Sequence, residues 1–141
     1  MNARMRMAVA LLAVVLAACD SPAEPSGPFE GTWYGPFVDS AGGTGSVQLV
    51  LKQSGAGVSG TFSMEFTNVL PDSVGTGGTV SGTATATSAS IFLKPSTPLS
   101  CGLSGTMGAT ISISTVKLTG NYSSLACNGA VTGTLDVGRV H

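Results

Sequence analysis

The chain has 141 residues, of which only 9% are charged, and its formal net charge is −1. The basic residues after the apolar amino terminus are Lys52, Lys94, Lys117 and Arg139, which stand apart from one another and are outnumbered by acidic ones. Nucleic-acid binding needs a positive stripe that neutralises phosphates, so the composition excludes nucleic acid as a partner.

Residues 1–19, MNARMRMAVALLAVVLAAC, have the layout of an export signal. Arg4 and Arg6 precede an unbroken apolar run from Met7 to Ala18. This run is shorter than the roughly 20 residues that a membrane-spanning helix needs, and its length is typical of the apolar region of a signal peptide. We therefore predict a signal peptide that ends at Ala18.

The apolar run ends in Leu16-Ala17-Ala18-Cys19, which resembles the lipobox of bacterial lipoproteins. In that family the peptide is cut before the cysteine, whose thiol receives a diacylglycerol and whose new amine is acylated, commonly with palmitate. The resemblance implies a lipid anchor on Cys19, and each buried methylene adds about 0.8 kcal/mol to membrane attachment. It also implies a place in the bacterial cell envelope, facing the periplasm or the exterior. An ordinary signal peptide with a chance cysteine is the alternative.

The segment after the signal peptide, residues 19–28, is rich in Pro and Ser and has no apolar periodicity. This composition is typical of a flexible tether. Residues 29–141 then have the size of one compact domain.

Alternation of apolar and polar residues runs through this domain and predicts β-strands. The clearest segment is GVSGTFSMEFTN, in which Phe62, Met64 and Phe66 share one face. Together with seven similar segments it predicts eight strands. Their inward residues are, strand by strand, Gly31, Trp33, Gly35 and Phe37; Val47, Leu49 and Leu51; Val58, Gly60, Phe62, Met64 and Phe66; Val80, Gly82, Ala84 and Ala86; Ala89, Ile91 and Leu93; Leu103, Gly105, Met107, Ala109, Ile111 and Ile113; Leu118, Gly120 and Tyr122; and Val131, Gly133, Leu135 and Val137.

The breaks between these segments are too short for the crossovers that parallel strands require. We therefore expect an all-β domain, an antiparallel meander that closes into an eight-stranded up-and-down β-barrel. Connections alternate between the two ends of such a barrel. The longer ones, after the first, third, fifth and seventh strands, share one end, which we call the long-loop end; the other is the tight-turn end.

A four-residue pattern of an apolar residue, a hydroxyl, a glycine and a small polar residue recurs in five strands. The copies are Val58–Thr61, Val80–Thr83, Leu103–Thr106, Leu118–Asn121 and Val131–Thr134. In each copy the glycine is on the inward face and the residue after it faces solvent. Glycine in a strand usually marks a bend, a bulge or a close approach. Small barrels need such bends to close, so we expect these glycines to bend the wall. A glycine-rich phosphate cradle is the alternative, but it needs a helix after the strand, and no helix is predicted.

The remaining cysteines, Cys101 and Cys127, both fall at the long-loop end. Two cysteines in an exported chain most often pair, because the compartment is oxidising. A disulfide that closes a loop of about 27 residues would stabilise the fold by roughly 3 kcal/mol in the chain-entropy model. Two free thiols are the alternative. A metal site is not expected, because the only histidine is His141 at the chain end.

The last strand of a closed barrel pairs with the first, which brings Arg139 near Trp33. We expect a cation–π contact that contributes about 0.5–2 kcal/mol. The stretch FEGTWYG, Phe29–Gly35, resembles the Gly-x-Trp motif that opens lipocalin-like barrels, and avidin-like barrels begin in a similar way. In lipocalin-like barrels the tryptophan packs at the closed end under a late arginine, so the resemblance implies these roles for Trp33 and Arg139.

Catalysis is not expected. A Ser-His-acid or Cys-His arrangement needs a histidine, and the single histidine, His141, stands at the chain end. Asp39 and Asp72 could meet at the long-loop end as a catalytic pair; the alternative is that both are solvated loop carboxylates. The sequence also shows no cofactor motif.

Two functions stay open. The first is binding of a small apolar ligand inside the barrel, since eight strands enclose just enough space for side chains or one small ligand. The second is a non-catalytic interaction module with a filled barrel, such as a hydrolase inhibitor, that binds an envelope protein through apolar loop residues. The candidate residues of the cavity or mouth are Phe37, Phe62, Met64, Phe66, Val69, Leu70, Leu99, Ile111 and Tyr122.

Overall fold

The computed structural model describes residues 27–67, 75–96, 107–114, 117–126 and 129–141. The strands in this part of the chain are β1 (Gly31–Asp39), β2 (Thr44–Ser54), β3 (Gly57–Phe66), β4 (Gly75–Ala84), β5 (Ser88–Pro95), β6 (Met107–Ser114), β7 (Lys117–Ala126) and β8 (Gly129–Val140). None of the described segments forms a helix that is long and apolar enough to cross a membrane.

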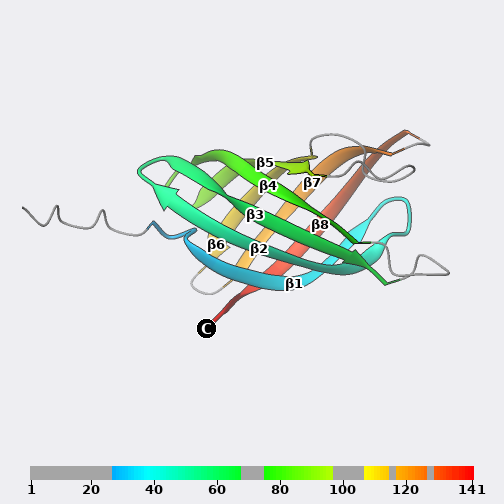
Figure 1. Ribbon diagram of the computed structural model, residues 1–141, viewed down its shortest axis with the longest axis horizontal. Coiled ribbons are helices and arrows are strands. Elements are labelled where there is room, and N and C mark those ends of the chain that lie inside the picture. Colours follow the sequence, from blue (N-terminus) through cyan, green and yellow to red (C-terminus); the bar gives the residue numbers. More distant parts are fainter. Residues whose placement is uncertain (1–26, 68–74, 97–106, 115–116, 127–128) are drawn as a thin grey trace, which may run out of the picture.

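Each strand pairs antiparallel with the next, and β8 returns to pair with β1, which closes the barrel (Figure 1). The predicted eight-stranded antiparallel up-and-down barrel is therefore confirmed. Connections leave the carboxyl ends of β1, β3, β5 and β7 at the long-loop end, and the C-terminus lies near the opposite end (Figure 1).

The alternation in the sequence explains which side chains enter the core. In β3, Phe62, Met64 and Phe66 are buried, while the residues between them are exposed, because successive side chains of a strand point to opposite faces. One inward residue is wrongly predicted. Ala86 is exposed, because β4 ends at Ala84 and the chain turns back at once, with the Thr85 amide donating to the Ser88 carbonyl at 2.7 Å.

The tight-turn end is plugged by a residue that precedes the first strand. Phe29 has no exposed surface, and its amide donates to Gln53 Oε1 at 3.1 Å. The indole Nε1 of Trp33 donates to the Phe29 carbonyl at 2.9 Å. Full burial of a phenylalanine side chain contributes about 1.5–3 kcal/mol, so Phe29 is a part of the core that the strand pattern does not reveal.

Arg139 closes the same end from the outside. It is the register partner of Trp33 across the β1–β8 pair, and its Cζ lies 4.4 Å from the indole centroid. Its Nη1 donates to the Glu30 carbonyl and its Nη2 to the Pro28 carbonyl, both at 2.8 Å. The predicted cation–π contact is confirmed, and the guanidinium also holds the turn that carries Phe29.

The glycines of the repeated pattern lie where neighbouring strands come closest. A Cβ at Gly60, Gly82 or Gly120 would overlap a backbone carbonyl oxygen of the adjacent strand, so these three glycines mark close approaches between strands, and the predicted bending stays a prediction. Gly133 differs, because a Cβ there would overlap the ring of Tyr122. Gly105 lies outside the described residues, together with Leu103.

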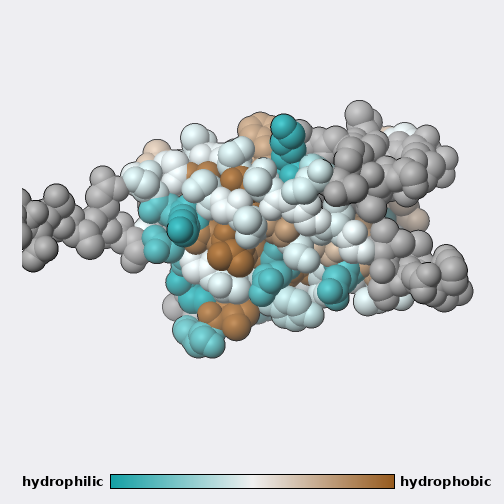
Figure 2. Space-filling model, in the orientation of Figure 1, coloured by the Kyte–Doolittle hydropathy of each residue, from teal (hydrophilic) through white to brown (hydrophobic). Residues whose placement is uncertain are grey.

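The outer wall is mostly polar. In the part of the chain that the structure describes, the large apolar side chains that remain exposed are Tyr34, Val38, Val50, Phe92 and Val140. On the face in Figure 2 the apolar residues form separate groups between pale and hydrophilic ones, so this face offers no continuous apolar surface.

Candidate functional site

The described part of the barrel interior is filled by side chains. An enclosed cavity of about 10 Å³ lies between Phe37, Val47, Met64, Leu93, Tyr122 and Leu135. This is about the space that one water molecule needs. The Phe37 ring packs edge to face on Phe66, with centroids 5.0 Å apart, and on Tyr122 at 6.4 Å. Aromatic rings therefore occupy this part of the interior, which leaves no room for an apolar ligand between these residues.

The predicted cavity and mouth residues divide into two groups. Those that are inward-facing and buried are Phe37, Phe62, Met64, Phe66, Ile111 and Tyr122. Val69, Leu70 and Leu99 lie outside the described residues, as do Asp72, Cys19, Cys101 and Cys127. The lipid anchor and the disulfide therefore stay predictions.

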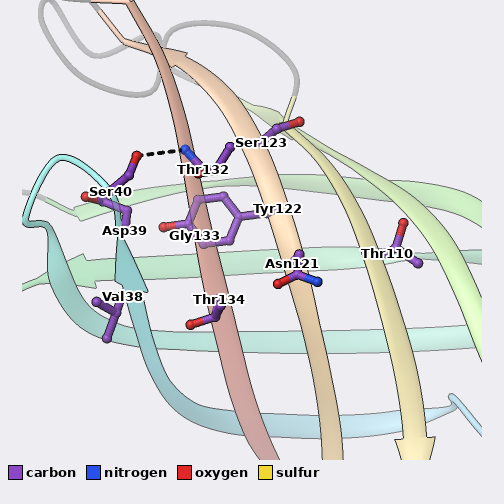
Figure 3. Close-up of a pocket in the computed structure, with 10 residues that line it drawn as sticks. All are labelled: Val38, Asp39, Ser40, Thr110, Asn121, Tyr122, Ser123, Thr132, Gly133 and Thr134. Atoms are coloured by element: carbon purple, nitrogen blue, oxygen red, sulfur yellow. Dashed lines mark hydrogen bonds between the residues drawn. The ribbon is translucent and has the colours of Figure 1, made fainter.

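A larger hollow lies on the barrel wall at the long-loop end (Figure 3). Its volume is about 590 Å³. We call it the β8 groove and define it by residues from three adjacent strands and the turn after β1, namely Asp39, Ser40, Asn121, Tyr122, Thr132 and Thr134.

The barrel register aligns the outer residues of this groove. Asn121 on β7 is paired with Thr134 on β8, and on its other side with Thr110 on β6, which also lines the groove. All three are exposed. Since neighbouring strands are about 4.8 Å apart, they present a row of hydroxyl and amide groups across the wall.

The rim of the groove is fixed by backbone hydrogen bonds. The Ser40 amide donates to the Thr132 carbonyl at 2.7 Å, and the Thr132 amide donates to Ser40 Oγ at 3.1 Å (Figure 3). Asp39 Oδ1 accepts hydrogen bonds from the amides of Ala41 at 2.9 Å and Gly43 at 2.7 Å. The carboxylate of Asp39 is therefore held in a defined position at this corner.

Tyr122 lies behind this rim. The side chain is only 4% exposed, and its ring extends from β7 across Gly133 toward Asp39 (Figure 3). Its hydroxyl has no hydrogen-bond partner among the described residues. Burial raises the pKa of the Tyr122 phenol above its ordinary value, and the Asp39 carboxylate raises it further. The phenol therefore stays protonated and can donate a hydrogen bond.

The groove offers hydrogen-bond donors and acceptors and one carboxylate. Across the described ranges, no three His, Cys, Asp or Glu side chains group as metal ligands. Apart from Tyr122, the groove residues are not indicated as binding residues by the sequence pattern. Two of them, Asn121 and Thr134, follow the glycine in two copies of the repeated pattern. This position indicates a shared site only after the register shows that the two residues are cross-strand neighbours.

Comparison with known proteins supports the fold. No protein-family model matches the chain, and no curated protein matches it. Among solved structures, a redesigned β-barrel aligns with 79% of this chain and 91% of its own length, with a TM-score of 0.50 and 16% sequence identity. A likeness at this identity shows the fold alone.

Proposed function

We propose that this chain is a membrane-anchored lipoprotein of the bacterial envelope whose filled barrel is a non-catalytic binding module that acts through its long-loop end. The observation that carries the proposal is the contrast in space. The interior cavity between the described residues measures about 10 Å³, whereas hollows on the outer wall measure about 590 Å³ at the β8 groove and about 550 Å³ beside Glu30 and Lys52 at the tight-turn end. The predicted lipid anchor would turn the second of these hollows toward the membrane, which leaves the β8 groove for a partner.

The strand order supports the orientation of such a module. The turn before β1 lies at the tight-turn end, where Arg139 holds it through the Pro28 and Glu30 carbonyls. A lipid on Cys19 would therefore hold this end toward the membrane. The long-loop end would then point away from the membrane, where an envelope partner can reach it.

The lipid anchor is tested by expressing the full-length chain and its Cys19→Ser variant in bacteria with labelled palmitate. The wild-type chain should incorporate the label and sediment with membranes, and the variant should do neither. Equal labelling of both chains would remove Cys19 as the anchor.

The mode of binding is tested with apolar probes and a loop variant. A filled barrel should show no saturable binding of fatty acids or apolar dyes and no rise of the melting temperature with them. Replacing Val69 and Leu70 with serine should reduce recovery of an envelope partner in pull-down experiments. Saturable fatty-acid binding would contradict the proposal, and so would equal recovery of the partner by the wild-type chain and the loop variant.

A further inference from the structure

We propose that the β8 groove binds an uncharged, hydroxyl-rich ligand of the oligosaccharide class. This inference rests on the proposed function, because it names the ligand chemistry for the long-loop end of the binding module. The chemistry of the lining, the continuity of the polar surface and the charge of the site support it.

The lining consists of exposed groups that are ready to form hydrogen bonds. The side chains of Thr110, Asn121 and Thr134 form no hydrogen bond to another residue in the described part of the chain. Hydroxyl groups both donate and accept, and the asparagine amide provides donors and an acceptor. A ligand with many hydroxyl groups can satisfy all of these groups at once.

The polar surface continues beyond the β8 groove. A second hollow of about 470 Å³ shares Thr110, Asn121 and Thr134 with it and extends toward Thr119 and Asp136. Asp136 is paired with Lys117 at 3.2 Å, so this extension carries little net charge. Two hollows that share a row of residues suit an extended chain of sugar units better than a single compact molecule.

The charge of the groove selects against other ligand classes. Asp39 is its only lining residue with a charged side chain, so phosphates, sulfates and carboxylates would meet repulsion. Apolar ligands would desolvate the row of hydroxyl and amide groups without replacing their hydrogen bonds. Val38, which is 51% exposed beside the row, offers an apolar contact for the carbon-bound hydrogens of a sugar ring.

The experiment is calorimetric titration of the detergent-solubilised full-length chain with two hexasaccharides of equal length. The first is an uncharged glucose hexasaccharide, and the second is a hexasaccharide of galacturonic acid, which carries carboxylates. We expect millimolar binding of the uncharged probe and weaker binding of the acidic one. Equal or tighter binding of the acidic probe, or no binding of the uncharged one, would overturn the ligand class.

Variants of the outer row locate the site. Asn121→Ala and Thr134→Ala should each weaken binding of the uncharged probe about tenfold, the effect of losing one hydrogen bond. Thr61→Ala is the matched control, because Thr61 follows the glycine of the same repeated pattern but lies exposed on β3, outside the groove. Equal weakening by Thr61→Ala, or no weakening by the groove variants, would overturn the site.

Tyr122→Phe is a second control, because the Tyr122 side chain is buried inside the barrel against Phe37, behind the outer row. It should leave binding of the uncharged probe unchanged while circular dichroism shows an intact fold. Clearly weakened binding would show that the probe does not bind on the outer wall. If the uncharged hexasaccharide does not bind but the Val69 and Leu70 variant still loses its envelope partner, the oligosaccharide class is wrong and the proposed function stands. Saturable fatty-acid binding would instead contradict the proposed function.

Discussion

The guanidinium of Arg139 lies over the Trp33 indole, 4.4 Å from the ring centroid, and seals the tight-turn end of the barrel. Trp33 in turn donates its Nε1 hydrogen to the carbonyl of Phe29, the residue that plugs this end. One cation therefore stabilises the last strand, the first strand and the turn that precedes it.

Replacing Arg139 with alanine should lower the melting temperature and leave the barrel folded. The change removes a cation–π contact worth about 0.5–2 kcal/mol and two hydrogen bonds worth about 1 kcal/mol each, so a loss of about 2.5–4 kcal/mol is expected. Thermal unfolding followed by circular dichroism measures it. Arg139→Lys keeps the charge but cannot reach both Pro28 and Glu30, and should lose about half as much. Unchanged melting of the alanine variant would exclude a stabilising role for Arg139.

Gly82→Ala should destabilise the barrel by about 1–3 kcal/mol, the usual cost of overpacking. The added Cβ would overlap the Ser90 carbonyl oxygen of β5, and this backbone cannot move without distorting the sheet. Gly75→Ala is the control, because its Cβ would meet only the Met64 carbonyl oxygen at an ordinary 3.5 Å. Chemical denaturation of both variants gives the two free energies of unfolding. Equal stability of the two would show that close approach does not explain Gly82.

Tyr122 should make the barrel less stable at alkaline pH. Its pKa is raised in the folded state, mainly by burial and further by Asp39. Above pH 10, the ordinary value, the unfolded chain releases this proton while the folded chain keeps it, so the free energy of unfolding falls as the pH rises. Denaturation series from neutral to alkaline pH should show a smaller fall for Tyr122→Phe. The exposed Tyr34 provides the control, because Tyr34→Phe should retain the fall. The same fall in both variants would assign it to other groups.

Cys101 and Cys127 should form a disulfide in the exported protein. Peptide mapping without reductant should recover the two cysteines in one linked species, and reduction should lower the free energy of unfolding by roughly 3 kcal/mol. The Cys101→Ser/Cys127→Ser double variant should match the reduced protein and should not respond to reductant. Free thiols in the untreated protein would favour the alternative interpretation.

The strand count and the inward residues could be predicted because they depend on a local rule. Side chains of a strand alternate between its two faces, so Phe62, Met64 and Phe66 had to share a face wherever β3 was placed. The contact of Arg139 with Trp33 could be predicted as well, because closure of an eight-stranded meander joins β8 to β1. The burial of Phe29 could not be predicted in this way, because Phe29 lies in a turn, where apolar and polar residues do not alternate.

The sequence by itself determined an all-β meander with glycines at repeated inward positions. Only the tertiary structure decided whether those small residues leave a cavity, and among the described residues it fills the space in two ways. Adjacent backbone closes in at Gly82 and Gly120, and the Tyr122 ring crosses Gly133. The cross-strand register of the folded barrel also decided that Thr110, Asn121 and Thr134 form one row. Periodicity sets which face a residue takes, whereas the cross-strand register and the packing of distant residues set what it meets.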